Sequence, residues 1–167
     1  MNGSVVRLCV LLVVLAVETP AVMAGYDSTY DALTRQLSQG SEDEIAAILQ
    51  NDCRFQEILS RIENGDDSLI RLAPRLRAHL DGANALGLEF ALSRALRLSP
   101  EAVLSLIPAI PLDRLCTVPW IEAPPDIERR WRLSVRPVLL DVSDPALRGR
   151  RDACLMRIGA PERPTTP

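Results

Sequence analysis

Lysine is missing from this sequence, and all 19 basic residues of the 167-residue chain are arginine. Aromatic residues are scarce, with two each of tryptophan, tyrosine and phenylalanine, and the one histidine is His79. So few rings argue against a stacking platform for single-stranded nucleic acid. One histidine with widely separated cysteines cannot complete a tetrahedral zinc site, and we expect a structural or surface role for His79. We therefore expect no metal, no cofactor and no nucleic-acid partner.

Clusters of glycine are missing as well, because the eight glycines stand singly, near the ends of predicted helices. A phosphate-binding loop needs several glycines after a strand and is excluded. Acids do cluster at residues 42–44 and 66–67, but acids at a predicted helix start are explained by capping and by the helix dipole. These patterns do not favour an enzyme. The alternative that stays open is a small envelope hydrolase with paired carboxylates such as Asp66, Asp67 or Glu89.

Long apolar runs are limited to the ten residues Leu8–Val17, which follow Arg7. Ten helical residues rise about 15 Å, half of a hydrocarbon core of roughly 30 Å, so the run is too short for a membrane anchor. A basic start, a short apolar run and small residues at Val22 and Ala24 are typical of a secretory signal peptide. We expect cleavage after Ala24, which places the mature chain in the periplasm or outside the cell and leaves no transmembrane segment.

Three cysteines remain after cleavage, namely Cys53, Cys116 and Cys154. Exported proteins generally hold cysteine pairs oxidised. We predict a disulfide between Cys116 and Cys154, because these two flank a proline-rich section that has few residues for core packing. Two interpretations stay open for Cys53: a buried small apolar side chain, which we favour, or an intermolecular bridge in a dimer. The oligomeric state is otherwise open.

Apolar residues of the mature chain recur at helical spacing, with almost no alternation at period two. Ser41 and Glu44 form a capping box, and Pro74 is expected to bend or break its helix. We predict an all-α fold, an irregular bundle of about six to eight short helices, with a helical-hairpin solenoid as the alternative. Residues 1–24 are the signal peptide, 25–158 a single helical domain and 159–167 a disordered tail.

Residues 116–158 form a section with a different composition, rich in proline and arginine. Cys116–Pro125 is predicted to be an irregular crossing segment in which Trp120 and Ile121 pack on the helical body. The disulfide ties this section to the last helix.

The remainder of that section is ambiguous. Residues 126–136 predict a helix, or a strand at residues 132–135, and residues 138–140 are equally undecided. Asp144 is expected to start a last helix that runs to Ile158.

Charge is distributed unevenly: residues 25–125 hold 15 acids and 9 arginines, whereas residues 126–167 hold 6 acids and 9 arginines. Such asymmetry can steer a partner, or the halves can neutralise each other across a packing surface, which we favour.

Trp120 is a candidate interface residue because tryptophan is enriched at interaction hot spots. Arg129, Arg130 and Arg132 are candidates for contact with an anion, a lipid headgroup or an acidic partner, or else form the polar face of a helix. The sequence favours an exported, non-enzymatic protein of the bacterial cell envelope that binds another protein. An inhibitor or immunity-type protein is one such form.

Overall fold

The computed structural model describes residues 32–159 and contains no strand within that range. By its internal contacts the chain divides into two compact units, Met1–Gln36 and Leu37–Pro167. The described residues of the first unit, 32–36, are helical. The predicted signal peptide lies outside the described residues, as does the predicted tail from residue 160 onward. The prediction of an all-α fold is confirmed.

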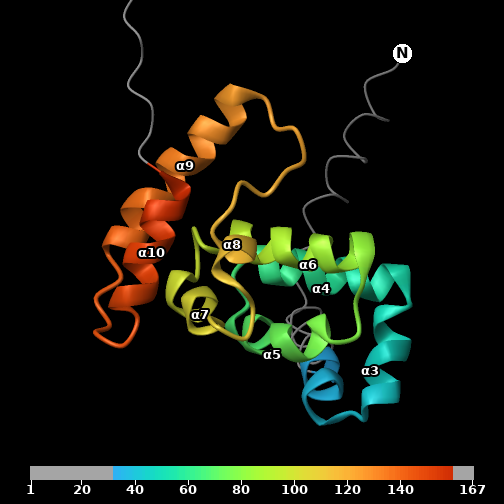
Figure 1. Cartoon of the computed structure of the whole chain (residues 1–167). Coiled ribbons are helices and arrows are strands. Elements are labelled where there is room, and N and C mark those ends of the chain that lie inside the picture. The colour runs from blue at the N-terminus through green and yellow to red at the C-terminus, as the bar shows by residue number, and fades with distance from the viewer. Residues whose placement is uncertain (1–31, 160–167) are drawn as a thin grey trace, which may run out of the picture. The chain divides into compact units, whose positions relative to one another are not determined.

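Eight labelled helices form the described part of the second unit, and they are short and joined by short connections (Figure 1). The helices are α3 (Glu42–Leu49), α4 (Asp52–Glu63), α5 (Asp67–Arg77), α6 (Gly82–Ala95), α7 (Pro100–Ser105), α8 (Leu112–Leu115), α9 (Pro125–Leu140) and α10 (Arg148–Ile158).

Side-chain caps explain where several of these helices begin. At α3 the Glu44 amide donates to the Ser41 hydroxyl, and the Ser41 amide donates to the Glu44 carboxylate, which is the predicted capping box. Asn51 accepts from an amide of α4, and Asp66 accepts from two amides at the start of α5. Each cap satisfies amides that have no partner inside the helix and so fixes the start of the helix.

The central pair of the bundle is α4 and α6, which pack against each other. Phe55, Ile58 and Ile62 recur at helical spacing on α4 and are buried, as are Leu88 and Leu92 on α6. Burial of each such side chain contributes about 1.5–3 kcal/mol, so this pair forms the core on which later segments pack.

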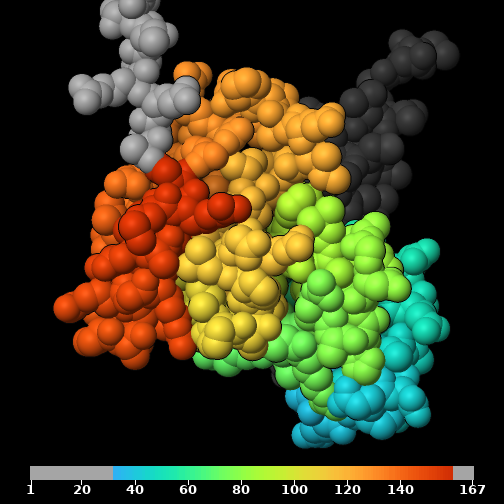
Figure 2. Space-filling view, viewed as in Figure 1, coloured from blue at the N-terminus to red at the C-terminus, as the bar shows by residue number. Residues whose placement is uncertain are grey.

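The short helices α7 and α8 connect this pair to the C-terminal section. Figure 2 shows residues of this region, in yellow, between green residues of the α5–α6 region and red residues of α10. The Ser93 hydroxyl on α6 donates to the Leu115 carbonyl at 2.6 Å, which fastens α8 to the core.

Residues 125–140 form one continuous helix, α9, so the strand interpretation is wrong. Trp131, Val135 and Leu139 are buried at helical spacing, which a strand would not achieve. The last helix begins at Arg148, later than predicted, because Asp144 instead accepts from the Ala146 amide in a turn.

The two prolines inside helices, Pro74 and Pro137, do not interrupt them. α5 runs through Pro74 without a break, and α9 runs through Pro137. The buried faces of both helices offset the loss of one backbone hydrogen bond. None of the helices between residues 32 and 159 is long and apolar enough to span a membrane.

The predicted disulfide is present between Cys116, at the end of α8, and Cys154, within α10. Its sulfur atoms lie 2.05 Å apart, and the two residues are separated by 38 positions in the sequence. The expectation that Cys53 is buried is wrong, since Cys53 is exposed near the start of α4 and forms no disulfide among the described residues. Its side chain faces solvent because the apolar stripe of α4 lies elsewhere on the helix.

Candidate functional site

A groove of about 330 Å³ lies where the end of α6, the segment that precedes α9, and α9 itself come together. Residues 116–124 leave α8 and loop across to the start of α9 (Figure 1). The groove combines two indole rings with three guanidinium groups. Its lining residues are Glu63, Arg94, Arg97, Trp120, Ile127, Arg130, Trp131 and Ser134.

Trp120 is held at the groove by Arg94. The guanidinium carbon of Arg94 lies 5.4 Å from the centre of the Trp120 ring, within the range of a cation–π interaction. Arg94 also donates to the Pro119 carbonyl at 2.9 Å and pairs with Glu63 at 3.4 Å. These contacts fix the backbone and ring orientation beside the groove, while 38 % of Trp120 stays exposed.

Ile121 does not pack on the helical body as expected, because it is 71 % exposed. The neighbouring Pro119 is buried, and Glu122 adopts a φ of 51° in the left-handed region. The chain is therefore anchored at Pro119 and turns after Ile121, which leaves the Ile121 side chain outside the core.

Trp131 lines the same groove but is 4 % exposed. Its indole Nε1 is the one buried side-chain nitrogen or oxygen without a hydrogen-bond partner among the residues that the structure describes. Leaving a buried donor unpaired costs about 1–3 kcal/mol. Tryptophan N–H groups usually find a partner when buried, so this arrangement is unusual for a side chain that serves packing alone.

The positive charge of the groove is compensated unequally. Arg94 pairs with Glu63, and Arg130 pairs with Asp126 at 2.7 Å. Arg97 is exposed, and its guanidinium has no hydrogen bond or ion pair with any residue in the range 32–159. Arg97 is thus the groove cation that is open to an external anion.

The candidate interface residues predicted from the sequence separate in the structure. Trp120 and Arg130 line the groove, whereas Arg129 and Arg132 do not. Arg129 is exposed on α9, and Arg132 is bound to Glu128 one turn earlier, at 3.0 Å from its Nε.

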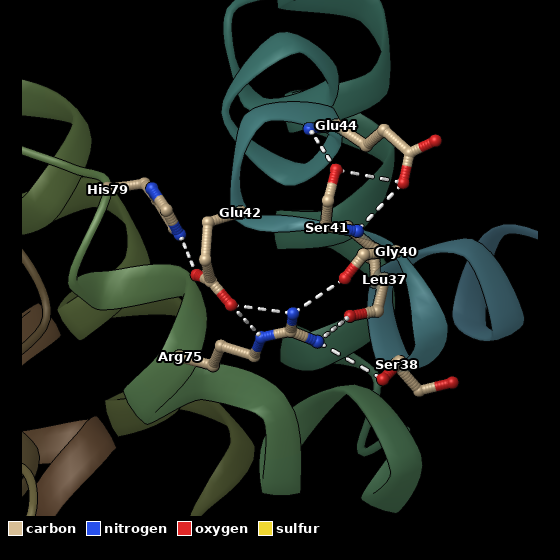
Figure 3. Close-up of polar contacts among 8 residues, drawn as sticks. All are labelled: Leu37, Ser38, Gly40, Ser41, Glu42, Glu44, Arg75 and His79. Atoms are coloured by element: carbon tan, nitrogen blue, oxygen red, sulfur yellow. Dashed lines mark hydrogen bonds and ion pairs between the residues drawn. The ribbon is translucent and has the colours of Figure 1, made fainter.

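A second polar cluster joins the start of α3 to α5 (Figure 3). Arg75 donates through Nε and Nη2 to one oxygen of Glu42, at 2.9 and 2.6 Å. His79 Nε2 lies 2.6 Å from the other oxygen of Glu42. Arg75 also donates to three backbone carbonyls, those of Leu37, Ser38 and Gly40. We name Glu42, Arg75, His79 and these carbonyls the α3–α5 clamp.

Electrostatics within the clamp favour the charged form of Glu42. The hydrogen bonds from Arg75, followed by the contact with His79, hold the pKa of the Glu42 carboxyl below its ordinary value of 4.5. Backbone and hydroxyl donation from Ser41 likewise lowers the pKa of Glu44. Figure 3 shows all three nitrogens of the Arg75 guanidinium and both oxygens of the Glu42 carboxylate bonded within the cluster, so these two groups have a structural role.

The acids named for the hydrolase alternative are not gathered into a pair. Asp66 caps α5 and pairs with Arg61 at 2.6 Å, and the exposed Asp67 pairs with Arg71 at 3.3 Å. Glu89 is buried on α6, where its two oxygens lie 2.9 Å from Arg77 and 3.6 Å from Arg114. Each carboxylate therefore has a cationic partner and a structural role.

Arg97 and Trp131 are among the groove residues that the sequence did not single out. Trp131 follows the apolar period of α9 and indicates only burial, while Arg97 resembles any exposed arginine at a helix end. The groove forms only when the 116–124 segment packs between α6 and α9. No family model, curated protein or solved structure matches the chain, so the case for its function rests on these residues.

Proposed function

We propose that this chain is an exported, non-enzymatic protein of the bacterial cell envelope that binds another protein through the groove beside Trp120. The observation that carries the proposal is Trp120 itself, which is partly exposed and held in place by Arg94. An aromatic side chain that is already ordered loses little conformational entropy on binding, which is why such side chains serve as anchors.

The surroundings of Trp120 support this role. The adjacent Ile121 is 71 % exposed and extends the apolar surface beyond the groove. Arginine and tryptophan together are the residue types most enriched where partner proteins make their strongest contacts. The disulfide at Cys116 lies four residues before Trp120 and restrains the same segment.

Export is part of the proposal and rests on the first 24 residues and on the oxidised cysteine pair. Within the envelope, an inhibitor or immunity-type protein is one form that a small helical binder takes. We do not favour the hydrolase alternative, because Asp66, Asp67 and Glu89 each have the structural partners described above.

The test is capture of a partner from envelope extract by the tagged mature protein, with two matched variants. Trp120→Ala removes the anchor, and Leu133→Ala removes a side chain that is also exposed, at 50 %, but lies on α9 outside the groove. We expect a protein that is captured by the wild type and by Leu133→Ala but is lost with Trp120→Ala. Equal capture by both variants, or no capture at low and moderate salt, would contradict the proposal.

A further inference from the structure

The groove holds two donors that the fold leaves unused. Arg97 is an exposed guanidinium without a partner among residues 32–159. The Trp131 indole N–H is buried without an acceptor. Both side chains line the same groove, and a small movement of the groove wall must uncover the shielded indole N–H before a bound group can accept from it.

The remaining groove charges define which group fits. Glu63 lines the groove but is paired with Arg94, and Arg130 is paired with Asp126. Three arginines and one glutamate line the groove, which gives a positive balance. An acceptor with negative charge is therefore favoured, because it pairs with Arg97 without the need to break an existing ion pair.

Apolar surface adjoins this charge. Trp120 and Ile127 line the groove, and the exposed Ile121 lies next to Trp120 in the chain. A free inorganic anion would leave this surface uncovered. A carboxylate carried on a peptide, with apolar side chains beside it, would use both the charge and the indole surface.

We infer that the groove recognises an acidic side chain of the partner protein, whose carboxylate binds Arg97 and accepts a hydrogen bond from the Trp131 indole N–H, with flanking apolar residues against Trp120. This inference rests on the proposed function and names the chemistry of the partner for the same groove. The buried N–H then gains the acceptor that the free protein lacks, which recovers part of its desolvation cost on binding.

The experiment uses nuclear magnetic resonance of the ¹⁵N-labelled mature protein, because its two tryptophans give two indole N–H signals. Trp120→Phe and Trp131→Phe assign them. The probes are an acetylated and amidated peptide Ala-Leu-Glu-Leu-Ala, the same peptide with Gln in place of Glu, and inorganic phosphate. We expect the Glu peptide to move the Trp131 indole proton downfield in a saturable way, and the Gln peptide to bind about tenfold more weakly.

Two exposed arginines whose side chains have no partner among residues 32–159 give a matched pair of variants. Arg97→Gln is expected to weaken binding of the Glu peptide about tenfold, whereas Arg129→Gln, on α9 outside the groove, leaves it unchanged. Equal binding of the Glu and Gln peptides, equal loss in both arginine variants, or phosphate that displaces the Glu peptide at the same concentration would each overturn the inference.

Failure of the inference can be distinguished from failure of the proposed function. If the envelope partner is captured in a Trp120-dependent way but the Glu peptide leaves the Trp131 signal in place, the carboxylate inference is wrong and the proposed function stands. If the Glu peptide binds through Arg97 but no partner capture depends on Trp120, the groove is an acidic-peptide site and the proposed anchor role of Trp120 is wrong.

Discussion

The α3–α5 clamp and the groove are both built around an arginine, and they differ in how completely their polar groups are used. In the clamp, Arg75 donates through all three nitrogens, to Glu42 and to three carbonyls. In the groove, Arg97 has no partner among the described residues and the Trp131 N–H has no acceptor. Arg75 and Glu42 are fully paired without a ligand, whereas the Arg97 guanidinium and the Trp131 N–H are not.

This contrast separates polar groups that hold the fold from polar groups that are open to a partner. A satisfied network fastens two helices and gains nothing from a ligand, since a ligand would have to break bonds that already exist. An unpaired buried donor beside an exposed cation gains from an incoming acceptor. Substitutions that change one of the two regions at a time separate these roles.

Loss of the disulfide is expected to have the largest effect on stability. The bridge holds Cys116, at the start of the segment that carries Trp120. The paired change Cys116→Ser with Cys154→Ser opens a loop of 38 residues and lowers the free energy of unfolding by about 4 kcal/mol in the chain-entropy account. Urea unfolding measures it. The matched control is Cys53→Ser, an exposed cysteine without a disulfide, which should change stability by less than about 0.5 kcal/mol. A similar small change in the double variant would refute the role of the bridge.

Arg75→Gln breaks the clamp and is expected to have the next largest effect on stability. It removes the three hydrogen bonds to carbonyls near the start of α3, and we expect the free energy of unfolding to fall by about 1–2 kcal/mol. Arg71→Gln is the matched control on the same helix, because Arg71 is exposed and its one ion pair among the described residues is with Asp67. We expect this change to lower the free energy of unfolding by about 0.5 kcal/mol or less. Peptide binding at the groove should survive both changes, and its loss in Arg75→Gln would show that the two regions are coupled.

Acid should weaken the clamp through Glu42. The pKa of this carboxyl is lower in the folded chain than its ordinary value of 4.5, so the folded protein keeps the charged form at a pH where the unfolded chain is protonated. The stabilisation is therefore complete above the ordinary pKa and is lost as the pH falls through the lowered pKa. The measurement is the melting temperature against pH for the wild type and for Glu42→Gln.

The Glu42→Gln profile should lie below that of the wild type near neutral pH and approach it in acid. In an Arg75→Gln background the difference should shrink, because the largest cause of the lowered pKa has been removed. A constant gap between the two profiles at every pH would argue against a role for the charge.

The smallest expected effect is a difference in fluorescence emission between the two tryptophans of the groove. Trp131→Phe leaves the 38 % exposed Trp120 as the emitting residue, and Trp120→Phe leaves the 4 % exposed Trp131. The first protein should emit at longer wavelength and be quenched more readily by acrylamide. Identical spectra would mean that both rings share one environment, contrary to the groove described above.

Several elements were predictable because their signals are local. The capping box at Ser41 and Glu44 depends on two residues three positions apart, and the helical period of α4 depends on its own apolar stripe. Pairing of Cys116 with Cys154 followed from the composition between them. The strand interpretation within residues 126–136 failed because a short window contains too few turns to distinguish period two from period 3.6.

Export, the all-α class and the disulfide pairing were thus predictions from the sequence by itself, and the structure confirms the latter two. Only the tertiary structure decided that Arg97 and Trp131 share a groove with Trp120, that Cys53 is exposed, and that Arg75 rather than any acid organises the clamp. The physical reason is distance along the chain. Caps and periods are set by neighbours a few residues apart, whereas burial and unpaired donors depend on segments that only packing brings together.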